Sequence, residues 1–231
     1  MSFVVTPPAI PSIPVVGESA RFPIHRIYCV GRNYEEHAKE MGHTGREAPF
    51  FFMKPADAAL VAEAGQTVAM PYPTLTSNLH HEVELVVAIG KGGSNIVAAN
   101  ARQHIYGYAA GLDMTRRDLQ NDMKKQGRPW CIGKGFDFSA PIGPITPAAQ
   151  VPGIHSAAIA LQVNGQDRQR STIAKLIWNI AETIEQLSAA WTLQPGDLIF
   201  TGTPEGVGAV VRGDVLLASV DGLQPLHVQL V

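Results

Sequence analysis

The sequence predicts a single, β-rich α+β domain. The chain has 231 residues, enough for one large domain with a full hydrophobic core. Hairpin turn signals recur through its second half, and no internal repeat or long linker divides it. Three stretches with helical spacing, near residue 34, over residues 113–124 and over residues 171–191, supply the helical part.

The first 25 residues are rich in proline, which excludes a regular helix there. The prolines are Pro7, Pro8, Pro11, Pro14 and Pro23. We predict that residues 1–25 form an extended strap over the body and that residues 26–231 form the folded domain.

A strand-to-helix switch follows the strap. Residues 26–31 read as a short buried strand that ends at Gly31. A helical pattern then runs from about Tyr34 to Met41, with Asn33 as its expected N-cap.

The run His80–Ile89 places two carboxylates in an apolar strand. Side chains alternate between the faces of a strand, so Glu82 and Glu84 are expected to project from one face together with His80. Two like charges that are held close and partly buried cost free energy unless a cation neutralises them. A bound metal ion is the simplest such cation.

The C-terminal half is predicted to be mostly sheet. Asn164-Gly165 and Asp221-Gly222 are hairpin turn signals, and Pro195-Gly196-Asp197 precedes another short strand. The exception is the stretch from Ser171 to Trp191, whose apolar residues predict one amphipathic helix capped by Ser171 or Thr172.

Composition and charge favour a small-molecule partner. The net charge is −2 and the isoelectric point is about 6.4, which gives no global attraction to nucleic acid or to an anionic membrane. No apolar run reaches the roughly 20 residues that span a bilayer, and no targeting segment is evident. Cys29 and Cys131 lie in unrelated contexts and are expected to be reduced. We interpret the chain as a cytoplasmic protein.

A third carboxylate follows a glycine-rich strand. Residues 105–112 read as a strand, and Asp113 at its end could join Glu82 and Glu84. An all-carboxylate site favours Mg²⁺ or Mn²⁺, with Ca²⁺ possible, over zinc or copper. The alternative is that the two glutamates form surface ion pairs and Asp113 caps the next helix.

Polar residues with helical spacing follow Asp113. Arg117, Gln120 and Lys124 share one helical face with it, and Arg117 and Gln120 would overlook the metal. A solvated basic helix face is the alternative. Lys134 lies between two glycines and is either a buried cation or a turn residue.

Two further features are candidates for chemistry. His37 and Glu40 are three apart on the early helix, where the carboxylate could orient the imidazole as a general base, although such pairs are common. The loop Thr201–Gly208 could hold a carboxylate with its amides and hydroxyls, or it could be an ordinary hairpin connection.

The chain resembles the fumarylacetoacetate hydrolase family, and within it the short acylpyruvate hydrolase branch. Six separated motifs carry the resemblance in order from about Arg26 to the C-terminus. They are Tyr28–Tyr34, Phe52-Met53-Lys54-Pro55, His80–Glu84, Gly111–Thr115, Lys134 and Thr201–Pro204.

The resemblance implies a mixed β-roll of the family's C-terminal type, with a few flanking helices and usually a homodimer. It implies that Glu82, Glu84 and Asp113 bind Mg²⁺ or Mn²⁺. It further implies a water-activating dyad of His37 and Glu40, with Lys134 also catalytic. The implied substrate-binding residues are Arg32, Arg117, Gln120 and Thr203.

The implied reaction is carbon–carbon hydrolysis of a 2,4-dioxo acid. Fumarylpyruvate would give fumarate and pyruvate, as in the bacterial gentisate route. His37 would remove a proton from the water that attacks the C4 carbonyl, and pyruvate enolate would leave beside Lys134. The alternatives are oxaloacetate decarboxylation, isomerisation of a hydroxymuconate-like dienol, and non-catalytic binding of dicarboxylates.

Overall fold

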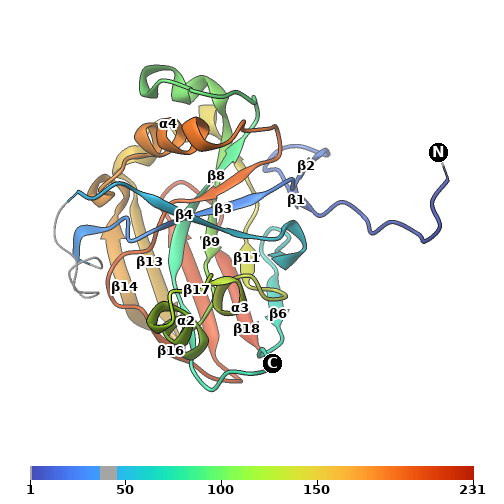
Figure 1. Cartoon of the computed structure of the whole chain (residues 1–231), viewed down its shortest axis with the longest axis vertical. Coiled ribbons are helices and arrows are strands. Elements are labelled where there is room, and N and C mark those ends of the chain that lie inside the picture. Colours follow the sequence, from blue (N-terminus) through green and yellow to red (C-terminus); the bar gives the residue numbers. More distant parts are fainter. Residues whose placement is uncertain (1, 37–45) are drawn as a thin grey trace.

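The computed structural model describes residues 2–36 and 46–231, and its strands form two large curved sheets that pack together, with a few helices around them (Figure 1). The β-rich α+β architecture expected from the sequence is confirmed. The larger sheet has the order β4-β3-β15-β8-β9-β11-β5, and β12 pairs with β9 beside that path. Its strands are β3 (Ile27–Gly31), β4 (Phe50–Lys54), β5 (Ala59–Val61), β8 (Val83–Ile89), β9 (Ile105–Leu112), β11 (Ala140–Ile142), β12 (Thr146–Pro147) and β15 (Leu198–Phe200).

The second sheet has five strands in the order β14-β13-β17-β18-β6. The hairpin signal at Asn164-Gly165 joins β13 to β14, with φ angles of 51° and 75° at the two turn residues. The signal at Asp221-Gly222 lies between β17 and β18, which pair antiparallel as expected. The strands are β6 (Thr67–Met70), β13 (Ala158–Val163), β14 (Gln166–Thr172), β17 (Val215–Val220) and β18 (Leu226–Leu230).

Short elements complete the described chain. The small sheets contain β1 (Ser12–Pro14) with β2 (Arg21–Pro23), and β10 (Thr115–Arg116), β7 (Leu79–His81) and β16 (Gly208–Val210). The α-helices are α2 (Arg117–Lys125), α3 (Cys131–Lys134) and α4 (Ile180–Ala190). The 3-10 turns are η1 (Ala56–Ala58), η2 (Ala98–His104), η3 (Ala148–Gln150), η4 (Ile154–Ser156) and η5 (Ile173–Lys175). Within residues 2–36 and 46–231, none of the helices has the length and apolar character that crossing a membrane requires.

Strand β8 lies between two hydrophobic clusters. Val83, Leu85 and Val87 belong to the larger cluster, which fills the space between the two large sheets. Val86 and Ala88 belong to the smaller one, on the opposite face. The strand is therefore buried on both faces, and Glu84, which shares the alternation of Val86, enters the interior because the strand brings it there.

The long helix predicted over residues 171–191 is wrong in its first half. Strand β14 continues through Thr172, a 3-10 turn follows, and α4 begins only at Ile180. Asn179, rather than Ser171 or Thr172, caps it: the Asn179 side chain accepts from the Glu182 amide, and the Glu182 carboxylate accepts from the Asn179 amide. This capping box supplies a stronger helix start than the earlier residues do.

The helix expected from about Tyr34 to Met41 runs into residues 37–45, which lie outside the described chain, so a cap at Asn33 stays a prediction. The Asn33 side chain donates to the Trp178 and Thr201 carbonyls and accepts from the Trp178 amide. It therefore ties the segment after β3 to the connections before α4 and after β15.

The proline-rich N-terminus has two parts. Residues 12–24 lie against the body through Ile13, Phe22 and Ile24, which are buried in the smaller cluster. Residues 2–10 are exposed and extend away from the body (Figure 1). Only the later part therefore covers the fold. The division into residues 1–25 and a folded domain stays a prediction.

Candidate active site

Three buried carboxylates converge where β7, β8 and β9 meet. Glu82 lies between β7 and β8, Glu84 lies in β8, and Asp113 follows β9 directly. The antiparallel pairing of β8 with β9 brings them together, and the Asp113 amide donates to the Glu82 carbonyl at 2.9 Å. One oxygen from each carboxylate lies within 4.8 Å of the others. We call these three residues the acidic triad.

Three cations surround the acidic triad. Lys134 Nζ lies 2.8 Å from Glu82 Oε2 and 2.7 Å from Asp113 Oδ2. Lys54 Nζ lies 2.8 Å from Asp113 Oδ1, and Arg117 pairs with Glu82 Oε1. Three positive side chains thus offset three carboxylates, which is how so many charges can be buried together.

The surroundings of the acidic triad do not stabilise its charged groups equally. Burial, and then the Asp113 and Glu82 charges, raise the pKa of Glu84 well above its ordinary value, although the Gly202 amide donates to Glu84 Oε2 at 2.7 Å and opposes the shift. Burial alone would lower the pKa of Lys134, but the Asp113 and Glu82 carboxylates outweigh it and the pKa is raised. Lys134 is therefore a permanent cation, and Glu84 is the carboxylate most in need of another positive charge.

The acidic triad fits a divalent metal ion. Asp113 Oδ1 is buried, and its ion pair with Lys54 Nζ at 2.8 Å lacks hydrogen-bond geometry, so this oxygen keeps lone pairs for a metal ion. The donor set is all oxygen and triply negative, which suits hard cations such as Mg²⁺ and Mn²⁺. Exposures of 5% for Glu82 and 2% for Glu84 exclude the alternative that these two glutamates form surface ion pairs.

A small pocket opens onto the triad, with about 30 Å³ of space. Phe50, Phe52 and Trp130 form an aromatic wall, with ring centroids 5.3 and 5.8 Å from Trp130. The other lining residues are Val30, Gly31, Arg32, Glu82, Glu84, Asp113, Arg117, Gln120, Lys134 and Thr203.

The pocket brings together most of the residues singled out in the sequence. Arg117 and Gln120 are buried and bonded to each other at 2.6 Å, so they are not a solvated basic face. Lys134 is buried in α3 rather than exposed in a turn. Arg32 lies with its guanidinium carbon 5.3 Å from the Phe50 ring centroid, on backbone with a φ of 56°. His37 and Glu40 lie outside the described residues.

Asp113 does not begin the helix, as its spacing to Arg117 had suggested. The chain first forms β10, which pairs with β7, and α2 starts at Arg117. Arg117 still reaches the triad, because β10 places the start of α2 beside His80. Arg117 Nε lies 3.4 Å from His80 Nδ1.

The loop after β15 closes one side of the triad. Thr201, Gly202, Thr203 and Pro204 are all buried, and the Gly202 amide bonds to Glu84. A side chain at Gly202, where φ is 103°, would meet Asn33 at 2.7 Å. The loop is thus a fixed part of the site rather than an ordinary hairpin connection.

Sequence reasoning missed three residues that hold the site together. Lys54 was seen only as part of a motif, yet its Nζ is buried and also donates to the Met114 carbonyl and to the Lys134 carbonyl. Trp130 completes the aromatic wall. Gln169 is buried on β14 and bonds to residues of both the triad strand and the loop. A lysine that follows four apolar residues and precedes a proline was the available signal for Lys54; nothing local marked Gln169.

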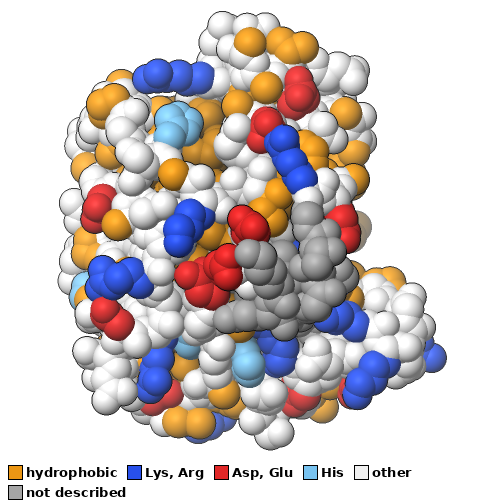
Figure 2. Space-filling model, turned by 90° about the vertical axis from the view of Figure 1, so that its left-hand side faces the viewer, with side chains coloured by type: hydrophobic (Ala, Val, Ile, Leu, Met, Phe, Trp, Pro, Cys, Tyr) orange, Lys and Arg blue, Asp and Glu red, His pale blue; other side chains and the backbone are white. Residues whose placement is uncertain are grey.

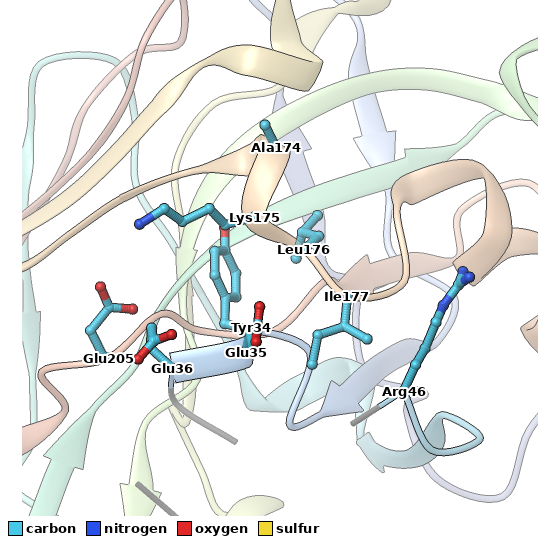
Figure 3. Close-up of a pocket in the computed structure, with 9 residues that line it drawn as sticks. All are labelled: Tyr34, Glu35, Glu36, Arg46, Ala174, Lys175, Leu176, Ile177 and Glu205. Carbon is cyan, nitrogen blue, oxygen red and sulfur yellow. The ribbon is translucent and has the colours of Figure 1, made fainter. Parts of the chain in front are cut away.

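A larger pocket, of about 520 Å³, lies elsewhere and contains none of the triad. Its lining mixes acidic, basic and apolar side chains (Figure 3): Tyr34, Glu35, Glu36, Arg46, Ala174, Lys175, Leu176, Ile177 and Glu205. On the face shown in Figure 2, acidic and basic side chains are interspersed. We place the chemistry at the smaller pocket because the buried charges converge there.

Comparison with known proteins relates this site to one family. The family profile described as fumarylacetoacetate (FAA) hydrolase C-terminal matches residues 26–231. A fumarylpyruvate hydrolase from a Ralstonia species is 51% identical over 177 residues, which are 77% of this chain and 90% of that protein. A mitochondrial oxaloacetate tautomerase from Rattus norvegicus is 44% identical over 197 residues, 85% of this chain and 87% of that protein.

The fold is shared with solved structures along its whole length. The crystal structure of a fumarylpyruvate hydrolase from Pseudomonas aeruginosa, in complex with Mn²⁺ and pyruvate, matches with a TM-score of 0.98 at 56% identity. The match covers 100% of this chain and 99% of that chain.

Proposed function

The chain belongs to the fumarylacetoacetate hydrolase family, and we propose that it is a metal-dependent hydrolase that cleaves fumarylpyruvate to fumarate and pyruvate. The observation that carries the proposal is the buried acidic triad, which faces a pocket lined by Arg117, Gln120 and Lys134. The 56% identity to a fumarylpyruvate hydrolase over the full chain supports the choice of substrate.

Glu82, Glu84 and Asp113 would hold the ion, with Mg²⁺ or Mn²⁺ preferred and Ca²⁺ possible. When bound, such an ion supplies Lewis-acid polarisation of substrate oxygens. Glu84 gains most from it, because its charge is otherwise opposed by burial and by the other two carboxylates.

The pocket offers separate partners for the two ends of a 2,4-dioxo acid. Arg117 and Gln120 present a guanidinium and an amide to a carboxylate. Lys134 Nζ is held by Glu82, Asp113 and Thr115 at the triad, where it can stabilise the negative charge that develops on departing pyruvate enolate. The aromatic wall and Arg32 are left for the planar, acidic fumaryl end.

The water-activating role of His37 and Glu40 is also proposed. A histidine oriented by a carboxylate can remove the proton of the attacking water. Lys54, Arg117 and Lys134, which surround the acidic triad, are not suited to that task because all three are positively charged. Exchange of His37 for alanine should abolish cleavage and leave Mn²⁺ binding intact.

The test of the function is a substrate panel on purified protein with Mn²⁺. Fumarylpyruvate, a neutral acylpyruvate and oxaloacetate are compared, with loss of the dioxo chromophore and formation of pyruvate and fumarate measured. The proposal expects fumarylpyruvate to be cleaved fastest, with both products in equal amounts. Fumarylpyruvate left intact, under conditions in which the protein binds Mn²⁺, would refute it.

Action on oxaloacetate is the second candidate. The 44% identity to an oxaloacetate tautomerase supports it, since oxaloacetate presents the same 2-oxo acid end to the site. The panel separates tautomerisation or decarboxylation from hydrolysis, because neither produces fumarate.

We also propose that the protein is a homodimer in the cytoplasm. Strand β4 is an edge strand of the larger sheet, and a third pocket, of about 510 Å³, is lined there by Phe50, Met53 and Trp130 among others. Edge strands with exposed apolar side chains are common places for chains to associate. Light scattering in solution measures the mass and decides between monomer and dimer. A role in gentisate degradation is a further proposal, which follows from the substrate.

A further inference from the structure

Gln169 joins two parts of the active site that are distant in sequence. It lies on β14, in the smaller sheet, and is 1% exposed. Its Oε1 accepts from the Val83 amide at 3.1 Å, and its Nε2 donates to Thr203 Oγ1 and to the Pro204 carbonyl, each at 2.8 Å. Val83 stands between the two glutamates of the triad, and Thr203 faces the pocket.

The orientation of this amide is determined by its partners. The Pro204 carbonyl can only accept a hydrogen bond, so the group facing it must be the NH₂. The Val83 amide can only donate, so the group facing it must be the oxygen. His81 Nδ1, 3.0 Å from the same oxygen, is then a donor as well. All four hydrogen-bonding positions of Gln169 are in use.

This orientation determines what Thr203 can offer a ligand. Thr203 Oγ1 accepts a hydrogen bond from Gln169 Nε2, and among the described residues no other hydrogen bond to that oxygen is found. A hydroxyl that already accepts keeps its own O–H free to donate. Because Thr203 lines the pocket, the free O–H is available to a carboxylate or enolate oxygen.

The surrounding packing keeps the loop in this arrangement. A side chain at Gly206, where φ is 89°, would meet the Arg168 carbonyl at 2.2 Å, so the loop lies directly on β14 beside Gln169. The Gly202 amide bonds to Glu84 from the same loop. Loop and triad strand are thus connected directly, through Gly202 and through Thr201, which donates to the Leu85 carbonyl, and also indirectly through Gln169.

We infer that Gln169 is a positioning residue that presents the Thr203 hydroxyl as a hydrogen-bond donor to the 2-oxo acid end of the ligand. The inference rests on the proposed function for the identity of the ligand. It assigns Gln169 no contact with the reacting atoms; Gln169 acts through Thr203.

The test is a double-mutant cycle that measures pyruvate affinity of the Mn²⁺-loaded protein by calorimetry. Gln169→Met and Thr203→Val should each weaken binding about tenfold, the size expected for one neutral hydrogen bond. The double variant should bind as weakly as Thr203→Val alone, because Gln169 has no effect without the hydroxyl. Losses that multiply in the double variant, or an unchanged affinity in Gln169→Met, would overturn the inference.

Controls separate this role from folding and from metal binding. Gln162→Met removes an amide on neighbouring β13 that bonds to exposed Asp167 at 2.8 Å, and it should change nothing. Mn²⁺ affinity should stay within about twofold in Gln169→Met, because the hydrogen bond from the Gly202 amide to Glu84 remains. A loss of Mn²⁺ binding in this variant would overturn the role through Thr203.

Variants of Thr203 and the comparison of pyruvate binding with turnover test the inference further. If Gln169→Met does not fold, Thr203→Ser should bind pyruvate as the wild type does and Thr203→Val about tenfold more weakly; equal affinities would show that the hydroxyl donates nothing. Pyruvate binding does not depend on turnover. A protein that binds pyruvate and cleaves nothing would therefore refute the proposed function while leaving the cycle informative.

Discussion

Lys54 Nζ lies 2.8 Å from Asp113 Oδ1, and both side chains are buried. The same ammonium group also donates to the carbonyls of Met114 and Lys134. Lys54 therefore fixes the Asp113 carboxylate of the acidic triad relative to the backbone of Lys134. The stability of the metal-free site therefore depends on Lys54, although Lys54 does not line the pocket.

Removal of Lys54 should destabilise the metal-free protein. Lys54→Met leaves the Asp113 carboxylate buried with one cation fewer, which costs about 3–5 kcal/mol of unfolding free energy. Mn²⁺ should restore part of the loss, because the ion supplies the missing positive charge. Urea unfolding with and without Mn²⁺ measures both effects. Lys125→Met, at a lysine that is 78% exposed, is the matched control. Equal stability of Lys54→Met and the control would contradict the role.

Removal of Lys134 should slow the reaction more than it weakens ion binding. Its ammonium is the cation at the point where charge develops, and loss of one such stabilising group typically lowers kcat about 10²–10³-fold. Steady-state kinetics of Lys134→Met on fumarylpyruvate, next to a Mn²⁺ titration, checks this. A Lys134→Met protein with wild-type kcat would remove Lys134 from the mechanism.

His80 should make the protein less stable in mild acid. Burial and then the Arg117 charge lower its pKa from 6.5 to about 4, so between these pH values the unfolded chain binds a proton that the folded chain does not. Stability contributed by neutral His80 is therefore full above pH 6.5 and is lost as the pH falls toward 4. Unfolding free energies at pH 5 and pH 7 should differ less in His80→Gln than in the wild type. An identical difference in the two proteins would show that His80 contributes nothing to the pH dependence.

Asn179 should contribute stability and no activity. Its side chain forms one half of the capping box of α4, and alanine at an N-cap costs about 1 kcal/mol. Thermal unfolding of Asn179→Ala should show this loss, while Gln186→Ala, inside the same helix, should show little. Turnover of both variants should equal that of the wild type. A loss in Gln186→Ala as large as in Asn179→Ala would argue against the cap.

The features that the sequence predicted well are local ones. Alternation along residues 80–89 predicted that Glu82 and Glu84 lie together, and both belong to the acidic triad. The single strand expected there is interrupted at Glu82, which lies between β7 and β8. The Asn164-Gly165 turn joined β13 to β14 as expected, since those two residues adopt the positive φ angles that the turn requires. The family resemblance, drawn from six separated motifs, is confirmed by the match over residues 26–231.

The features that the sequence did not reveal depend on contacts between distant segments. Lys54 meets Met114 across 60 positions, and Gln169 meets Val83 across 86, so no spacing rule could pair them. The error over residues 171–191 has a similar cause. Helical spacing was present, but residues 176–178 pair with Tyr34 and Asn33 instead of continuing a helix.

The most direct test of the central claim is the rate of fumarylpyruvate cleavage during a Mn²⁺ titration of protein stripped with a chelator. The account predicts no activity in the stripped protein and full activity at about one ion per triad, with Glu84→Gln failing to recover at the same Mn²⁺ concentrations. Full activity of the stripped protein, or normal recovery in Glu84→Gln, would contradict it.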